Sequence, residues 1–136
     1  MNKINWRLVN PLLDKKIIEL FEKENGITLP LDFKECIMEN NAGYPSLDIV
    51  TTIDGLEIEI NSLISYNKQD IDNIYNVFGF FKKEYNNTIL PIFTTSSNDY
   101  ICIDLLNQNV LYWQEQTGEL IFISENFTAF LNRCYN

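Results

Sequence analysis

Apolar residues near the start of the chain recur with the period of an α-helix. The stripe consists of Leu13, Ile17, Leu20 and Phe21. Spacings of three and four positions turn one face of a helix toward a core. Pro11 suits the first turn of such a helix, and Gly26 suits a left-handed residue at its end. We therefore predict a helix over residues 12–24.

From residue 47 the apolar period shortens to about two, which is typical of β-strands. Two β-branched runs, residues 47–53 and 56–60, are separated by Asp54-Gly55, and this dipeptide is a strong hairpin signal. In the second run one face carries Leu56, Ile58 and Ile60, and the other carries Glu57 and Glu59. The pattern predicts a hairpin with one core face and one acidic, solvent-facing face.

The rest of the chain divides into further short elements. They are a helix from Pro30 to about residue 40 with Phe33, Cys36 and Ile37 inward, a turn at residues 44–46, a helix over residues 70–85 capped by Asp70, antiparallel strands over residues 89–93 and 100–104, strands over residues 110–113 and 120–123, and a last helix from residue 127 with Ser124 as its N-cap. Because strands dominate the middle and helices flank them, the order favours an α+β fold. We expect one domain over residues 1–136, with about six strands and about four helices.

The net charge limits the class of partner. The 136 residues include 10 Lys and Arg against 19 Asp and Glu, a formal net charge of −9. Phosphate contacts need basic side chains, so the charge argues against direct nucleic-acid binding and against an anionic membrane surface. It favours an electropositive protein partner.

Side chains that carry catalysis or bind metals are scarce. The chain has no histidine, the commonest general base and a common metal ligand. Cys36, Cys102 and Cys134 form no C-x-x-C pair. Asp99 and Asp104 lie on or beside one predicted strand, but no basic residue or glycine-rich loop accompanies them. We therefore expect no catalytic site, no metal and no cofactor, although an enzyme that works without histidine stays as a third hypothesis.

The chain also lacks the usual targeting signals. Its first residues have no apolar core of the kind that a signal peptide needs, and no stretch approaches the ~20 apolar residues of a membrane span. The three cysteines suit buried free thiols in a reducing compartment. We expect a cytoplasmic protein with no membrane association.

Several landmarks occur in a recognisable order along nearly the whole chain. They are Trp6, Gly26-Ile27-x-Leu29-Pro30-x-Asp32-Phe33, Asn40-Asn41-Ala42-Gly43-Tyr44-Pro45, Leu90-Pro91-Ile92, Asp99-Tyr100-Ile101-Cys102-Ile103-Asp104, Val110-Leu111-Tyr112-Trp113 and Phe127-Thr128-x-Phe130-Leu131. Together they resemble the SUKH superfamily, the Smi/Knr-type domain. Two positions depart from its pattern: Ala42 stands where the family usually has glycine, and Asn98 stands where a glycine commonly precedes the aspartate.

The resemblance implies a central, largely antiparallel twisted sheet flanked by helices, and no active site. Bacterial members resemble immunity proteins, which neutralise toxin domains of polymorphic toxins, many of them nucleases. Fungal relatives act as regulatory scaffolds, so an intracellular protein-interaction scaffold is the alternative function. We expect the immunity function, with the toxin blocked by occlusion.

Candidate partner-binding residues come from the acidic surplus and from exposed aromatic residues. They are Tyr44, Asp48, Asp54, Glu57, Glu59, Tyr66, Asp99, Glu115 and Glu119. Carboxylates can mimic a phosphate backbone for a basic partner, and exposed tyrosines can supply desolvated anchors. Each of these acids has an alternative role in solubility or in turn formation, and Asn98-Asp99 in particular is typical of a turn. For Trp6, Tyr112 and Trp113 core packing is favoured over a binding platform, and for Leu29-Pro30 and Asn41-Ala42-Gly43 backbone geometry is favoured over a ligand pocket.

Overall fold

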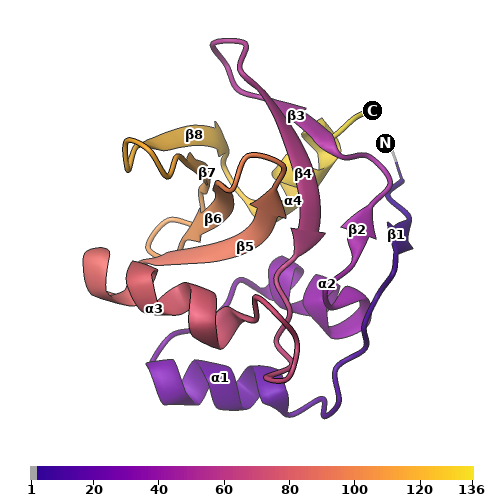
Figure 1. Cartoon of the computed structure of the whole chain (residues 1–136), viewed down its shortest axis with the longest axis vertical. Coiled ribbons are helices and arrows are strands. Elements are labelled where there is room, and N and C mark those ends of the chain that lie inside the picture. Colours follow the sequence, from indigo (N-terminus) through magenta and orange to yellow (C-terminus); the bar gives the residue numbers. More distant parts are fainter. Residues whose placement is uncertain (1–2) are drawn as a thin grey trace.

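The computed structural model describes residues 3–136 and has the predicted α+β fold (Figure 1). Its elements are β1 (Trp6–Arg7), α1 (Ile17–Asn25), α2 (Leu31–Asn40), β2 (Tyr44–Pro45), β3 (Ile49–Thr51), β4 (Glu57–Leu63), α3 (Ile74–Glu84), β5 (Ile89–Thr95), β6 (Tyr100–Asp104), β7 (Val110–Trp113), β8 (Leu120–Ser124) and α4 (Phe127–Arg133). The six predicted strands and four predicted helices are therefore all present, and β1 and β2 add a small second sheet.

The main sheet is a six-stranded antiparallel meander in the order β3-β4-β5-β6-β7-β8. Each strand pairs with the next along the chain: four of the connections are short turns, and the connection from β4 to β5 contains α3. Thr51 lies opposite Glu57, so Asp54-Gly55 forms the predicted hairpin turn, with Gly55 at a φ of 92°. Register shifts in β4, between Ile60 and Leu63, change the course of the sheet where it meets β5.

The helices cover the sheet and enclose an aromatic core (Figure 1). Helix α3 packs on β5, and α2 packs on α4 through Phe33 and Phe127, whose ring centroids are 5.3 Å apart. Phe21 of α1 contacts Phe78 of α3 at 5.8 Å. The predicted left-handed end of α1 is confirmed, because Gly26 has a φ of 64°.

Two predicted helix starts and two predicted N-caps were wrong. Helix α1 begins at Ile17, and the backbone N–H of Leu13 is bound by the Asn67 side chain outside the helix. Helix α3 begins at Ile74 with Asn73 as its N-cap, where Asp70 was expected. In α4 the N-cap is Asn126, which accepts a hydrogen bond from a helical N–H, where Ser124 was expected. The start of α4 at Phe127 is as predicted, and only its cap differs.

Two strand predictions also needed correction. Residues 44–46 were expected to form a turn, but Tyr44–Pro45 pairs with Trp6–Arg7 in the small sheet. Leu56 was expected on the core face, but it precedes β4 and is 39% exposed at the hairpin tip. The alternation of β4 itself is as predicted, since Ile58 and Ile60 are buried and Glu57 and Glu59 are exposed.

Candidate functional site

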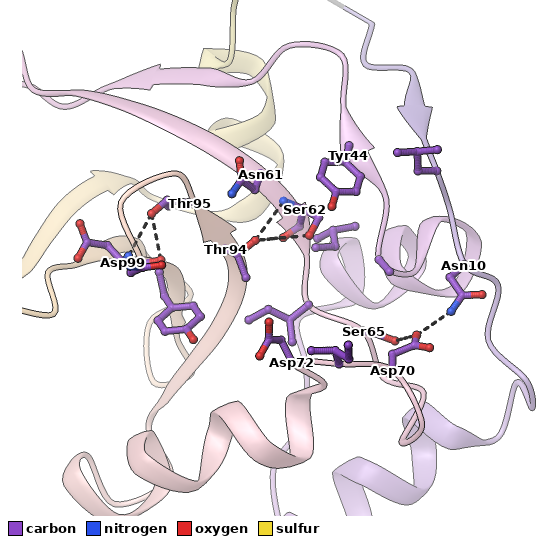
Figure 2. A pocket seen from close by; sticks show the side chains of 17 residues that line it. Asn10, Tyr44, Asn61, Ser62, Ser65, Asp70, Asp72, Thr94, Thr95 and Asp99 are labelled. Carbon is purple, nitrogen blue, oxygen red and sulfur yellow. Dashed lines mark hydrogen bonds between the residues drawn. The ribbon is translucent and has the colours of Figure 1, made fainter.

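A hollow of about 670 Å³ lies at the junction of both sheets and the segment before α3 (Figure 2). Its lining residues come from five segments, within residues 8–10, 42–44, 61–65, 70–72 and 94–100. A second hollow of about 460 Å³ shares Asp72, Asn98 and Tyr100 with it and extends to Glu115. We call these two continuous hollows the acidic groove.

The acidic groove carries charge of one sign. Asp70, Asp72 and Asp99 line the first hollow, and Figure 2 shows Asp70 and Asp72 on the segment before α3 and Asp99 on the β5–β6 turn. Glu115 lines the second hollow together with Asp72. Among the residues described, neither a lysine nor an arginine lines either part. Carboxylates gathered on a concave surface concentrate negative potential. The groove is therefore suited to cationic groups.

Exposed apolar side chains accompany these carboxylates. Leu8, Ile71 and Phe80 are 80%, 90% and 52% exposed, and Tyr44 is 39% exposed. All four line the acidic groove. Apolar side chains that contact solvent next to a concave, charged surface are characteristic of protein interaction sites.

A buried polar network supports the floor of the groove. Asp70 accepts hydrogen bonds from the Asn10 amide at 2.7 Å and from the Ser65 hydroxyl at 2.5 Å. Asn41, which is 1% exposed, donates to Ser65 at 3.1 Å and accepts from the backbone N–H of Tyr66 at 2.9 Å. The network holds residues 10, 41 and 65–70 together, and it makes Asp70 part of the framework.

Asp99 is fixed in a similar way at the other end of the groove. Its carboxylate accepts hydrogen bonds from the Tyr112 hydroxyl and, at 2.9 Å, from the backbone N–H of Glu115. Burial, followed by the bond to the Asp99 carboxylate, raises the pKa of Tyr112 to about 12. Asp99 therefore connects the β5–β6 turn to the end of β7.

Left-handed backbone conformations concentrate around the groove. Leu8, Ala42, Asp72 and Asn98 have φ values of 55°, 62°, 58° and 63°, and all four line it. Such conformations are unfavourable for residues with a Cβ, least so for Asn and Asp. The surrounding structure must therefore determine the backbone here, which makes the shape of the groove rigid.

The structure brings together only some of the predicted partner-binding residues. Tyr44, Asp99 and Glu115 line the acidic groove. Asp54, Glu57 and Glu59 are exposed on the β3–β4 hairpin, with half-buried Asp48 just before β3, and Glu119 is exposed in the β7–β8 turn. The predicted carboxylates thus form a groove group and a β3–β4 hairpin group, and Glu119 belongs to neither.

The prediction of Tyr66 as an exposed anchor was wrong. Its side chain is 1% exposed and contacts Phe21 edge to face, with ring centroids 5.1 Å apart. Burial raises the pKa of its hydroxyl. Tyr66 belongs to the core because the chain passes inward between β4 and α3.

Several groove residues were missed from the sequence. Leu8, Ile71 and Phe80 had no pattern that set them apart from core residues, and Asp70 and Asp72 were expected at a helix start. The preference for core packing is confirmed for Tyr112 and Trp113, which are 5% and 7% exposed.

Two other residues from the ordered landmarks, Asp32 and Gly43, also have structural roles. Asp32 of α2 accepts hydrogen bonds from the backbone N–H and the hydroxyl of Thr128 at 3.0 and 2.8 Å, which joins α2 to α4. Gly43 passes so near the Asn40 carbonyl that a Cβ would lie 2.9 Å from the oxygen. The Asn41-Ala42-Gly43 turn therefore has a steric reason for glycine at position 43.

Two further findings concern residues 3–136. Within them, no group of three or more Cys, Asp or Glu side chains is arranged to hold a metal ion. Helices long and apolar enough to cross a membrane are likewise absent from that range.

Comparison with known proteins identifies the fold family. The model of the SUKH_6 family, described as SMI1-KNR4 cell-wall, matches residues 15–131. A search of the curated proteins finds no match to the chain. The family match covers all six strands of the main sheet, four of the five groove segments in full and the Asp32–Thr128 connection. The chain therefore belongs to the SUKH_6 family of SMI1-KNR4 proteins.

Proposed function

We propose that this protein is an immunity protein that binds the toxin domain of a polymorphic toxin in the cytoplasm and neutralises it by occlusion. Proteins of the SUKH type are generally non-catalytic and are commonly immunity proteins, which supports the proposal. We favour a nuclease as the toxin, because its substrate groove must be positive to hold a phosphate backbone. The protein would then compete with nucleic acid for the same surface.

The observation that carries the proposal is the acidic groove. It joins Asp72, Asp99 and Glu115 to the exposed apolar side chains of Leu8 and Ile71. Carboxylates steer a basic partner into contact, and apolar side chains supply the desolvated centre that carries most of the affinity. The acidic groove carries the carboxylates and the apolar side chains on one concave surface.

The outer face of β4 extends this negative surface. Asn61 lines the groove, and Glu59 and Glu57 lie two and four positions before it on the same strand. Alternate residues of a strand share a face, so the two exposed glutamates precede Asn61 on its side of the sheet. A basic surface that fills the groove therefore meets further carboxylates toward the hairpin.

The test begins with capture of the partner. The tagged protein is incubated with a lysate of its own organism at low and moderate salt, and bound proteins are identified by mass spectrometry. We expect one partner that ends in a small basic toxin domain. Expression of that domain should arrest growth, and co-expression of this protein should restore it. Several housekeeping partners and no toxin would contradict the proposal and favour the scaffold function.

Matched charge variants then connect binding to the groove. Asp72→Asn with Glu115→Gln removes two groove charges, and asparagine tolerates the left-handed backbone of position 72. Glu24→Gln with Glu84→Gln removes two exposed charges from α1 and α3, outside the lining of the groove. We expect the groove pair to weaken toxin binding by roughly tenfold or more and the control pair by less than about twofold. If both pairs weakened toxin binding equally, binding would depend on the net charge of the protein and not on the groove.

A further inference from the structure

The β3–β4 hairpin projects from the body of the molecule (Figure 1). Apolar side chains lie at its tip. Ile53 is 78% exposed and Leu56 is 39% exposed, and they lie on either side of Asp54-Gly55. Hairpin turns are normally built from Gly, Asn, Asp, Ser or Pro. An exposed isoleucine at this position therefore calls for an explanation.

The turn has no conformational need for isoleucine. The backbone N–H of Thr52 donates to the Leu56 carbonyl at 2.9 Å, and the N–H of Gly55 donates to the Thr52 carbonyl at 3.0 Å. This is a three-residue loop that closes on a left-handed Gly55, with a φ of 92°. The hydrogen bonds come from the backbone and from Thr52, and Ile53 lies outside the buried core. Its side chain contributes little to the fold.

Side chains hold the hairpin in one conformation. Thr52, 3% exposed, donates from its hydroxyl to the Asp54 carboxylate at 2.6 Å and accepts from the Leu56 N–H at 3.0 Å. Arg133 donates to the carbonyls of Thr51 at 2.7 Å and of Ile123 at 2.8 Å. A rigid tip loses little conformational entropy when it binds.

The flanks of the tip are negative. Asp54, Glu57 and Glu59 are exposed, while the Arg133 guanidinium at the base is engaged by two backbone carbonyls. A second copy of this chain carries the same charge of −9, and an anionic lipid surface is also negative, so both would be repelled. The chemistry that fits the tip is an apolar pocket with a basic rim.

We propose that the β3–β4 tip inserts Ile53 into an apolar, basic-rimmed pocket of the toxin domain, as a second apolar contact beyond the acidic groove. This inference rests on the proposed function. Ile53 and Leu56 fill the pocket, and Asp54, Glu57 and Glu59 meet its rim. A toxin held at both the groove and the hairpin tip binds with a defined orientation, which occlusion of an active site requires.

The test uses the toxin domain identified by capture, and it measures its dissociation constant and dissociation rate for three variants. Ile53→Ser removes the apolar tip, Ile53→Leu preserves it, and Leu106→Ser removes a similarly exposed side chain, 80% exposed, between β6 and β7. We expect Ile53→Ser to weaken binding by roughly tenfold, mainly through faster dissociation. Ile53→Leu and Leu106→Ser should stay within about threefold of the wild type.

The outcomes separate the two proposals. All three variants should unfold at the wild-type urea concentration, which excludes a folding defect. If the wild type binds the toxin and Ile53→Ser binds equally well, the tip inference is overturned and the immunity function stands. If the wild type binds no toxin domain, the tip inference and the immunity function are both overturned.

Discussion

Tyr112 donates a hydrogen bond from its hydroxyl to the carboxylate of Asp99, and so connects β7 to the turn before β6. The same carboxylate accepts from the backbone N–H of Glu115 at 2.9 Å. Two donors thus converge on one side chain at the edge of the acidic groove. Asp99 was expected as a binding residue or as a turn residue, and these contacts support the turn role.

Asp99→Asn should destabilise the protein by about 1–2 kcal/mol, because an amide has one acceptor oxygen for two donors. Urea unfolding monitored by tryptophan fluorescence measures this difference. Glu115→Gln, which leaves the backbone N–H of residue 115 in place, is the matched control and should change stability by less than about 0.5 kcal/mol. Equal stability of Asp99→Asn and the wild type would contradict the structural role of the carboxylate.

Stability should fall in strongly alkaline solution. The pKa of Tyr112 is raised from 10.0 to about 12 in the folded state, so folding favours the neutral phenol. This contribution is fully present below pH 10 and is lost as the pH rises from 10 toward 12. The free energy of unfolding, measured by urea at several pH values, should decline over that window. In Tyr112→Phe the decline should be smaller, and an identical decline would contradict the assignment.

Ala42→Gly should stabilise the protein. Ala42 has a φ of 62°, a conformation that glycine adopts without the steric cost of a Cβ. We expect a gain of about 0.5–1 kcal/mol in the free energy of unfolding, because relief of backbone strain exceeds the greater flexibility of the unfolded chain. The neighbouring Gly43→Ala is the contrasting variant, since its Cβ would lie 2.9 Å from the Asn40 carbonyl oxygen. It should destabilise, and a stable Gly43→Ala would show that the turn can relax.

Local patterns predicted the elements whose stabilising contacts lie close in sequence. The alternation in β4 and the Asp54-Gly55 turn identified the hairpin, and the helix predicted from residue 127 is α4, in which Phe127 and Phe130 are buried. The start of α3 was predicted wrongly because residues elsewhere in the fold bind the side chain that was expected to cap it. Asp70 binds Asn10 and Ser65 and caps no helix, so helix α3 begins later than the sequence indicates.

The acidic groove was beyond the reach of sequence patterns for a related reason. Its lining comes from five segments, and residue 8 meets residue 98 only through the tertiary fold. Tyr66 was predicted to be exposed but is buried, because its burial depends on the course of the chain after β4. Charge and aromatic content could indicate the kind of partner, while the surface that would meet it required the structure.

Removing the two glutamates on the outer face of β4 should slow association with a basic toxin. Glu57→Gln with Glu59→Gln leaves the buried face of Ile58 and Ile60 intact. We expect the association rate to fall by roughly threefold to tenfold at low salt, and the difference to shrink as salt screens the charges. Stopped-flow fluorescence measures the association rate and its dependence on salt. A rate indifferent to salt and to this double variant would exclude electrostatic steering.

The three thiols should react slowly in the native protein and quickly after unfolding. Burial raises the pKa of Cys36 and Cys134 to about 12 and raises that of Cys102 as well. With a pKa of about 12 only ~0.01% of a thiol is ionised at pH 8, and the thiolate is the reactive form. Absorbance after addition of a disulfide reagent should therefore rise slowly in buffer and reach three thiols rapidly in denaturant.

Cys36→Ser locates the first thiol to react. Cys36 is half-buried in α2, whereas Cys102 and Cys134 are buried in β6 and after α4, where reaction requires larger opening of the fold. Without Cys36, the remaining reaction should slow further and should follow the rate at which the core opens. A fast native reaction that persists in Cys36→Ser would show that Cys102 or Cys134 is accessible in the native protein, against its burial. It would then place local opening in the sheet or at the end of α4, beside the Arg133 contacts that hold the β3–β4 hairpin.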